Sequence, residues 1–322
     1  MTNKEKYVNF MKKVYIPIYS QDWWMDTVCM PENWDVWLYE KNNEIFAAMP
    51  YYFEKRGKYF YITKAIFTQN NGIIFRYPDG MNSISKQAYE EKIIDAACEY
   101  IASLNVDVYE QQYQYTFDNY LPFLWNGYKA IPRYTYVIEK GIDVEDVWSG
   151  ISSKYRRNIR KGQKAGKCSE NITVEEFYEE HRKIYLKQGK ECPFTFDVWQ
   201  RLYKNCVDRE CGKMLCYRDN NGNILSVLFL VWDDKAIYHL LGGSVPEFQH
   251  LETFNALVWE AICFSRKMGL AYDFEGSVIK RISKSFREYG GKPKLYFRIR
   301  KIFNEDILKM ECNEECEKLG ED

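Results

Sequence analysis

The sequence contains the same pattern of elements twice, and this repeat constrains the fold more than any other feature. Residues 34–53 (WDVWLYEKNNEIFAAMPYYF) and 213–233 (KMLCYRDNNGNILSVLFLVWD) each consist of two apolar runs that flank an Asn-rich turn. Runs of β-branched and aromatic residues around such a turn are typical of β-hairpins. The sequence therefore predicts one hairpin in each half of the chain.

Each predicted hairpin is followed by a helix and then a short strand. Residues 89–104 and 253–268 carry apolar side chains at helical spacing. The strands that we expect next are 106–110 and 270–275, each of which contains an aromatic residue followed by Glu. The order strand, strand, helix, strand, found twice, predicts a mixed α/β (α+β) fold of two lobes, each a mostly antiparallel sheet with flanking helices.

The expected boundaries follow from changes in composition. A strand-like stretch at 135–138 gives way to the polar segment 141–150, and an acid-rich segment begins at residue 305. We therefore predict a first lobe over 1–148, a second lobe over 149–304 and an acidic C-terminal tail over 305–322.

Composition excludes several classes of protein. The chain has 322 residues, 17% aromatic residues and a net charge of −1, which is typical of a compact domain and not of a disordered chain. The longest apolar run, 225–232, is too short to cross a bilayer, and residues 1–20 contain no secretory signal, so we expect a cytoplasmic protein. The ten cysteines are scattered without a Cys-x-x-Cys pair, which predicts reduced thiols and no metal site.

The small net charge hides two opposite segments. Residues 152–167 (SSKYRRNIRKGQKAGK) hold seven basic residues and no acid, whereas residues 305–322 hold eight acids and two lysines. We expect a helix over the basic segment, and its Arg156, Arg157 and Arg160 have the spacing for phosphate contacts. Three explanations stay open: a ligand such as a diphosphate or RNA, a solvated surface, or pairing with the acidic tail.

Two further motifs lie in the second half. Residues 236–252 read as a strand with Gly242-Gly243 near its end, then a loop before a helix, an arrangement that either binds an anion or forms an ordinary turn. In the strand 270–275, alternation places Asp273 and Glu275 on one side. Such carboxylates serve as general bases or as members of a structural ion network.

The first half of the chain contains an aromatic-rich turn. Several known catalytic motifs are absent from the sequence. Trp125 lies in this turn (residues 122–128) and Tyr134 follows it, so these rings either bind a sugar or nucleobase or pack in the core. The motifs of serine hydrolases, P-loop NTPases, zinc proteases and dinucleotide-binding enzymes are absent. His239 is interpreted as a packed core histidine.

Taken in order, several segments resemble one family. They are SKYRRNIRKGQKAG from Ser153, YHLLGGS from Tyr238, LVWEAICFSRKMG, DFEGS and FREYGGKP, with DWWMDTVC and PFLWNGYKAIPRYTYVI in the first half. Together they resemble FemAB-like acyltransferases, bacterial proteins of tandem GNAT (Gcn5-related N-acetyltransferase) fold that include the peptidoglycan-bridge aminoacyltransferases. The resemblance covers nearly the whole chain to about Phe303.

The resemblance implies two tandem GNAT-like lobes, with the donor beside the strand 236–244. The implied donor-binding residues are Tyr238, Leu241, Gly242, Gly243 and Ser244. Either acyl-CoA or aminoacyl-tRNA is the implied co-substrate, without a tightly bound cofactor. Two departures stand out: residues 249–254 contain no glycine where acetyl-CoA enzymes carry a Gly-rich motif, and Phe286 stands where the aminoacyltransferases tend to have Lys, with Lys284 close by.

The resulting prediction is an N-acyltransferase that acylates an amine of a cell-wall or surface-polysaccharide precursor. Glu275 is the first candidate for the base that accepts the amine proton, and Asp273 is the second. The predicted substrate-binding residues are Arg156, Arg157, Arg160, Lys161, Trp125, Tyr134 and Lys284. The alternative is a catalytically silent GNAT-fold protein that binds RNA or an anionic glycan through the basic helix.

Overall fold

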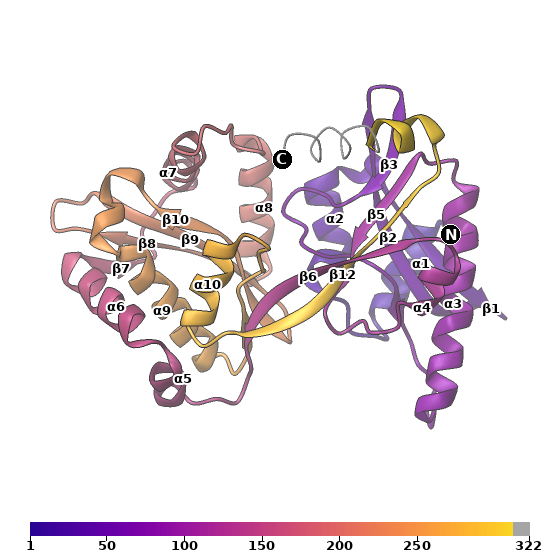
Figure 1. Cartoon of the computed structure of the whole chain (residues 1–322), viewed down its shortest axis with the longest axis horizontal. Helices are drawn as coiled ribbons and strands as arrows, with labels where there is room; N and C mark the ends of the chain where they lie inside the picture. The colour runs from indigo at the N-terminus through magenta and orange to yellow at the C-terminus, as the bar shows by residue number, and fades with distance from the viewer. Residues whose placement is uncertain (312–322) are drawn as a thin grey trace, which may run out of the picture. The chain divides into compact units, whose positions relative to one another are not determined.

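The computed structural model describes residues 1–311. By its internal contacts the chain forms two compact units (Figure 1). Unit 1 consists of residues 1–132 together with the described residues from Tyr296 onward, and unit 2 consists of Arg133–Leu295. The predicted tail lies partly outside the described residues; within it, residues 305–311 are helical.

Unit 1 contains the first predicted hairpin. Its strands are β1 (Trp34–Lys41), β2 (Glu44–Arg56), β3 (Tyr59–Thr63), β4 (Ile74–Phe75) and β5 (Val108–Gln112). Its helices are α1 (Asn3–Met11), α2 (Asp22–Cys29), α3 (Ser83–Ser103) and α4 (Leu121–Trp125). The turn between β1 and β2 is made by Asn42 and Asn43, both with positive φ, which is the backbone that a two-residue hairpin requires. The hairpin prediction for residues 34–53 is confirmed.

Unit 2 repeats this order with additional helices. Its strands are β7 (Lys167–Ser169), β8 (Gly212–Arg218), β9 (Ile224–Trp232), β10 (Ala236–Ser244) and β11 (Ala271–Asp273). Its helices are α5 (Val144–Gly150), α6 (Ser153–Ala165), α7 (Val174–Leu186), α8 (Phe196–Asp208), α9 (Thr253–Lys267) and α10 (Lys280–Glu288). The second predicted hairpin is β8 and β9, and the predicted helix 253–268 is α9. The prediction of a mixed, mostly antiparallel α/β fold is confirmed.

Two strands are shared between the units along the chain. β6 (Lys129–Ile138) begins in unit 1, and its Val137 and Ile138 pair antiparallel with β11 of unit 2. β12 (Lys292–Ile302) begins in unit 2, and its residues Arg298–Ile302 pair antiparallel with β5 of unit 1. The strand that pairs with β11 therefore begins in unit 1, and the strand that pairs with β5 begins in unit 2.

The sheet of unit 2 is covered on both faces, as Figure 1 shows. Helices α7 and α8 lie over one face, and α6 and α9 lie over the other. On the α9 side, the apolar face of the helix packs on Leu228, Leu230 and Ile237, all fully buried. Because both faces are covered, every side chain of β9 except Trp232 is buried, and the strand reads as one apolar run.

None of the described helices is both long and apolar enough to span a membrane.

Candidate active site at the fork between β10 and β11

The candidate site lies where β10 and β11 separate. The two strands pair in parallel over three residues, from Ala236 with Ala271 to Tyr238 with Asp273. β11 then ends, whereas β10 continues to Ser244 along β9. In an antiparallel pair every second residue turns its N–H and C=O away from the partner strand. Beyond Tyr238, the N–H and C=O groups of β10 that do not face β9 therefore point to the side of the strand along which β11 no longer runs.

A bulge in β10 determines which of its side chains face α9 and which face α7. The register with β9 shifts between His239 and Leu241, and one extra residue in a strand reverses the alternation of the side chains that follow. As a result both His239 and Gly242 approach Phe254 of α9, and Gly243 faces Ile184 of α7. A Cβ on Gly242 or Gly243 would lie within 2.9 Å of its neighbours. Gly242 and Gly243 thus have a packing role, and their contacts with the acyl donor stay a prediction.

The strand that was expected to reach Glu275 ends two residues earlier. Glu275 has φ +63° and Gly276 has φ +72°, so the chain leaves the sheet and strand alternation does not relate Asp273 to Glu275. Both carboxyl side chains are nevertheless buried, with exposed fractions of 6% and 8%. A non-glycine residue with positive φ is a strained backbone of the kind that often occurs at functional sites.

Asp273 holds this turn. Its Oδ1 accepts hydrogen bonds from the hydroxyl of Thr135 and from the backbone N–H of Glu275, the latter at 2.9 Å. Burial raises the pKa of Asp273 to about 6, and the two hydrogen bonds oppose that rise. Asp273 therefore acts on Glu275 through its backbone, which is a positioning role.

Gly276 allows the turn to pack on β6. A Cβ at this position would lie 2.3 Å from the backbone oxygen of Tyr134. We expect Gly276→Ala to lower the free energy of unfolding by at least about 2 kcal/mol, because the side chain adds a clash to an unfavourable φ. Chemical denaturation measures the change. Gly222→Ala is the matched control, since Gly222 has φ +85° and open space around it; equal losses for both variants would contradict the packing role.

The structure adds a contact of His239, a residue that the sequence analysis interpreted only as a core histidine. His239 is half-buried, and its Nδ1 lies 3.0 Å from the hydroxyl of Tyr272 on the paired strand. Burial lowers the pKa of His239 to about 4, so the imidazole is neutral at pH 7. No sequence pattern marks this contact, because it depends on how β10 pairs with β11, and His239 lies one residue beyond the last paired position of β10.

The basic segment forms α6, as predicted, and its basic side chains divide into two groups. Ser152 caps the helix by accepting the N–H of Tyr155. Arg156 donates to the carbonyls of Trp148 and Ser149 at the end of α5, and Arg160 lies over the Trp148 ring. Both arginines therefore contact α5, although Arg160 is exposed, and Arg157 and Lys161, one turn apart, are exposed as well.

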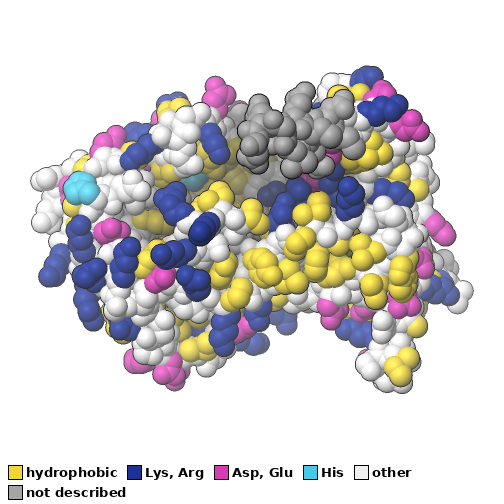
Figure 2. All heavy atoms as spheres, in the orientation of Figure 1, with side chains coloured by type: hydrophobic (Ala, Val, Ile, Leu, Met, Phe, Trp, Pro, Cys, Tyr) yellow, Lys and Arg dark blue, Asp and Glu magenta, His cyan; other side chains and the backbone are white. Residues whose placement is uncertain are grey.

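The exposed cations of α6 have no carboxylate partner in the part of the chain that the structure describes. Figure 2 shows Lys and Arg side chains gathered over α6 and α10. The predicted pairing with the acidic tail falls mainly outside the described residues; within them, Glu311 pairs with Arg300.

Helix α6 packs directly on the start of α9. A Cβ on Gly162 would lie 2.5 Å from the backbone oxygen of Glu252, the residue that precedes α9. Glu252 has φ +63°, and its carboxylate accepts a hydrogen bond from Asn255. The hydroxyl of Thr253, at the first position of α9, is fully buried and has no hydrogen-bond partner among the described residues. The start of α9 thus carries the acidic residue Glu252, and it packs against α6, the helix that carries the exposed cations.

The other predicted substrate-binding residues are all exposed at the surface. Trp125 is in α4 of unit 1 with 64% of its surface exposed, and Tyr134 is in β6 with 45% exposed. Lys284 is exposed on α10. Their roles stay predictions. Among the described residues no cluster of His, Cys, Asp and Glu is placed to hold a metal ion.

Comparison with known proteins identifies the unit that contains the fork. Residues 151–278 match the family model described as "Acetyltransferase (GNAT) domain". This stretch of the chain is therefore similar to GNAT acetyltransferase domains. The match includes α6, β10, α9 and β11, and with them both buried carboxyls. The GNAT domain confirms the prediction of an acyltransferase.

Solved structures share the fold of the whole chain. FemX matches with a TM-score of 0.68 at 13% identity, over 96% of this chain and 98% of its own. The C-terminal domain of a putative lysylphosphatidylglycerol synthetase from Agrobacterium fabrum matches with a TM-score of 0.54 at 9% identity, over 96% and 95%. A tandem GNAT protein from the clavulanic acid biosynthesis pathway matches with a TM-score of 0.52 at 8% identity, over 84% and 82%. No curated protein matches the sequence. The predicted resemblance to FemAB-like proteins is confirmed at the level of the tandem GNAT fold.

Proposed function

We propose that this protein transfers an acyl group from acyl-CoA to a primary amine at the fork between β10 and β11. The observation that carries the proposal is the fork itself, in a GNAT domain, with the buried carboxyls of Asp273 and Glu275 at the end of the shorter strand. The open side of β10 offers backbone donors along which an extended acyl donor can lie.

The chemistry assigns one task to each group at the fork. The neutral amine attacks the thioester carbonyl, its nitrogen bonds to carbon, and the carbon–sulfur bond breaks. Glu275 accepts the proton that the amine loses, and the departing thiolate is protonated from solvent. Unpaired N–H groups of β10 stabilise the negative charge that develops on the carbonyl oxygen. Holding the two reactants together supplies a further part of the rate, because amines attack thioesters readily once aligned.

The cations of α6 are proposed to hold the phosphates of the donor. A Gly-rich helix start would supply backbone donors for phosphate, but the start of α9 has no glycine and carries Glu252. Exposed Arg157 and Lys161 lie on the helix that packs against that start, and they supply the positive charge instead.

For the acceptor, we propose an amine of a cell-wall or surface-polysaccharide precursor. This finer assignment rests on the resemblance of the sequence to peptidoglycan-bridge aminoacyltransferases. The direct experiment supplies the purified protein with acetyl-CoA and a panel of amines, including amino sugars and lysine-containing peptides, and follows the release of free thiol. Amine-dependent thiol release supports the function. Its absence over the whole panel, with aminoacyl-tRNA active instead, would overturn the choice of donor.

Reversing the charge of Arg157 and Lys161 tests the phosphate contacts. We expect Arg157→Glu/Lys161→Glu to raise the KM for acetyl-CoA at least tenfold with a smaller effect on kcat, because hydrogen bonds to charged groups contribute about 1.5–3 kcal/mol each. Lys204→Glu is the control, since Lys204 is exposed on α8 over the opposite face of the sheet. An unchanged KM in the double variant would favour the solvated-surface explanation of α6.

The same double variant separates the enzyme from an RNA-binding protein. If α6 binds RNA, binding should weaken steeply with salt and be lost in the variant, while thiol release stays absent in both proteins. That result would replace the proposed enzyme by the binding alternative.

A further inference from the structure

A second candidate binding site lies wholly within unit 1. A cavity of about 310 Å³ opens between α3, the stretch from Asn70 to Tyr77 and the loop from Tyr113 to Asn119. This volume is at the lower end of the range of about 300–1,000 Å³ that is typical of small-molecule sites. Nothing in the proposed acyl transfer uses this cavity.

One wall of the cavity is aromatic. The rings of Phe75 and Phe117 are 6.1 Å apart with planes 17° from parallel, and Phe75 and Tyr77 are 5.7 Å apart at 30°. Phe117 also contacts the ring of buried Tyr113 at 4.6 Å. The wall therefore offers apolar surface that is held in place by ring-to-ring packing and does not need the ligand to order it.

A buried carboxylate stands at one end. Glu90 of α3 is 6% exposed and accepts hydrogen bonds from the hydroxyl of Tyr77 at 2.7 Å and from the amide of Asn119 at 3.2 Å. Lys86 lies 3.7 Å from the same carboxylate. With three donors around it, the charge of Glu90 is already compensated, so this carboxylate does not need a cationic ligand.

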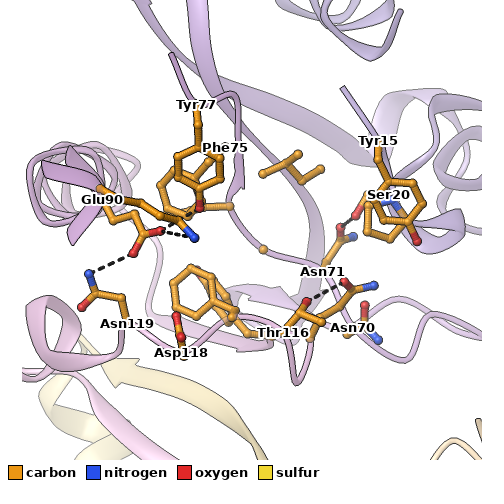
Figure 3. A pocket seen from close by; sticks show the side chains of 18 residues that line it. Tyr15, Ser20, Asn70, Asn71, Phe75, Tyr77, Glu90, Thr116, Asp118 and Asn119 are labelled. Atoms are coloured by element: carbon orange, nitrogen blue, oxygen red, sulfur yellow. Dashed lines mark hydrogen bonds and ion pairs between the residues drawn. The ribbon is translucent and has the colours of Figure 1, made fainter. Parts of the chain in front are cut away.

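Asp118, whose side chain is exposed to solvent, also lines the cavity, and the rest of the polar lining is neutral. Figure 3 shows Glu90 and Asn119 on one side of the cavity and Ser20, Asn70, Asn71 and Thr116 on the other. Asn71 is fixed, because its side-chain oxygen accepts the hydroxyl of Ser20 and its backbone N–H donates to Gln112. Side-chain amides and hydroxyls both donate and accept hydrogen bonds, as the hydroxyls of a sugar do.

We propose that this cavity binds one neutral pyranose ring. The aromatic wall takes an apolar face of the ring, and the amides and hydroxyls, together with the remaining lone pairs of Glu90, bind its hydroxyl groups. The proposal concerns unit 1 alone and does not depend on the acyl transfer proposed for unit 2.

Saturation-transfer NMR on the full chain tests the site, with glucose and N-acetylglucosamine as neutral probes and ethanolamine as a cationic probe. We expect at least one sugar to bind. Asn70→Ala should weaken that binding at least fivefold, and Thr116→Trp, which fills the mouth from an exposed position, should abolish it. Gln87→Ala is the control, because Gln87 is an exposed amide of α3 that does not line the cavity.

The outcomes separate the possibilities without any activity measurement. Sugar binding that is lost in the two cavity variants and kept in the control supports the proposal. No sugar binding to the unchanged protein, sugar binding that both cavity variants retain, or displacement of the sugar by ethanolamine would each overturn it. A melting curve for each variant establishes that it is folded, and Asn70→Ala carries the test if Thr116→Trp does not fold.

Discussion

Glu275→Gln is expected to lower kcat for acyl transfer by about 10² to 10⁴-fold. The change keeps the size and the hydrogen-bonding capacity of the side chain, so it removes mainly the ability to accept a proton. The assay is thiol release from acetyl-CoA with the amine that the panel identifies, measured from pH 6 to pH 9.

Two further variants make this result specific. Glu247→Gln removes an exposed carboxyl on the loop after β10 and should leave kcat unchanged. Asp273→Asn should lower kcat less than Glu275→Gln, because it weakens the support of the turn and leaves the base in place. Full activity of folded Glu275→Gln would exclude this base and favour catalysis by orientation, with neutral His239 as the next group to test.

His181→Phe is expected to reverse part of the loss of stability in acid. His181 of α7 is 4% exposed, and its ring lies between those of Phe177 and Phe194, with centroids 5.8 and 5.7 Å away. Burial lowers the pKa of His181 to about 4 from its ordinary value of 6.5. Between these values the unfolded chain binds a proton that the folded protein excludes, so the free energy of unfolding falls as the pH drops below 6.5.

The size of the effect follows from the two pKa values. At pH 5 the histidine should cost about 2 kcal/mol of stability, at about 1.4 kcal/mol per pH unit, and the full cost near pH 4 is about 3 kcal/mol. Phe fits the same aromatic stack without binding a proton. His181→Phe should therefore resemble the unchanged protein at pH 7 and be more stable by about 2 kcal/mol at pH 5, as measured by urea denaturation.

The comparison between the two proteins removes the contributions of other groups. Asp273 has a raised pKa, so its effect has the opposite sign: stability is lost as the pH rises from about 4 to about 6. The contribution of Asp273 is the same in His181→Phe and in the unchanged protein, so it cancels in the difference between them. His250→Gln, at an exposed position, is the control and should show no pH-dependent difference. A constant difference between His181→Phe and the unchanged protein at pH 7 and pH 5 would contradict burial of a neutral imidazole.

Local patterns predicted the secondary structure well where one signal dominates. The Asn-rich turns identified both hairpins, and the apolar spacing identified α3 and α9, although α3 begins at Ser83, six residues before the predicted start. β11 was predicted too long because residues 270–275 look like a strand throughout. The residues on either side of the left-handed Glu275 contact a distant part of the chain, since Thr135 donates to Asp273 and Gly276 lies against Tyr134.

The candidate site was predicted in part. Asp273 and Glu275 were chosen as carboxylates at a strand end, and both are buried beside the fork. Their separate roles depend on one hydrogen bond to the N–H of Glu275, which no sequence pattern reveals. Similarly, α6 was predicted as one block of charge, but the structure divides it, because Arg156 and Arg160 contact α5 while Arg157 and Lys161 face solvent.

The sequence alone determined that the chain repeats one α/β pattern, that α6 is a basic helix and that two carboxylates lie near the end of a strand of the second half. These features are local, since turns, helical spacing and charge runs are set by residues close together in the chain. Only the tertiary structure decided that β12 pairs with β5, that β10 and β11 part after three residue pairs, and that the cavity of unit 1 is formed. Each of these joins residues far apart in the sequence, and such pairings depend on which buried surfaces fit together rather than on any local preference.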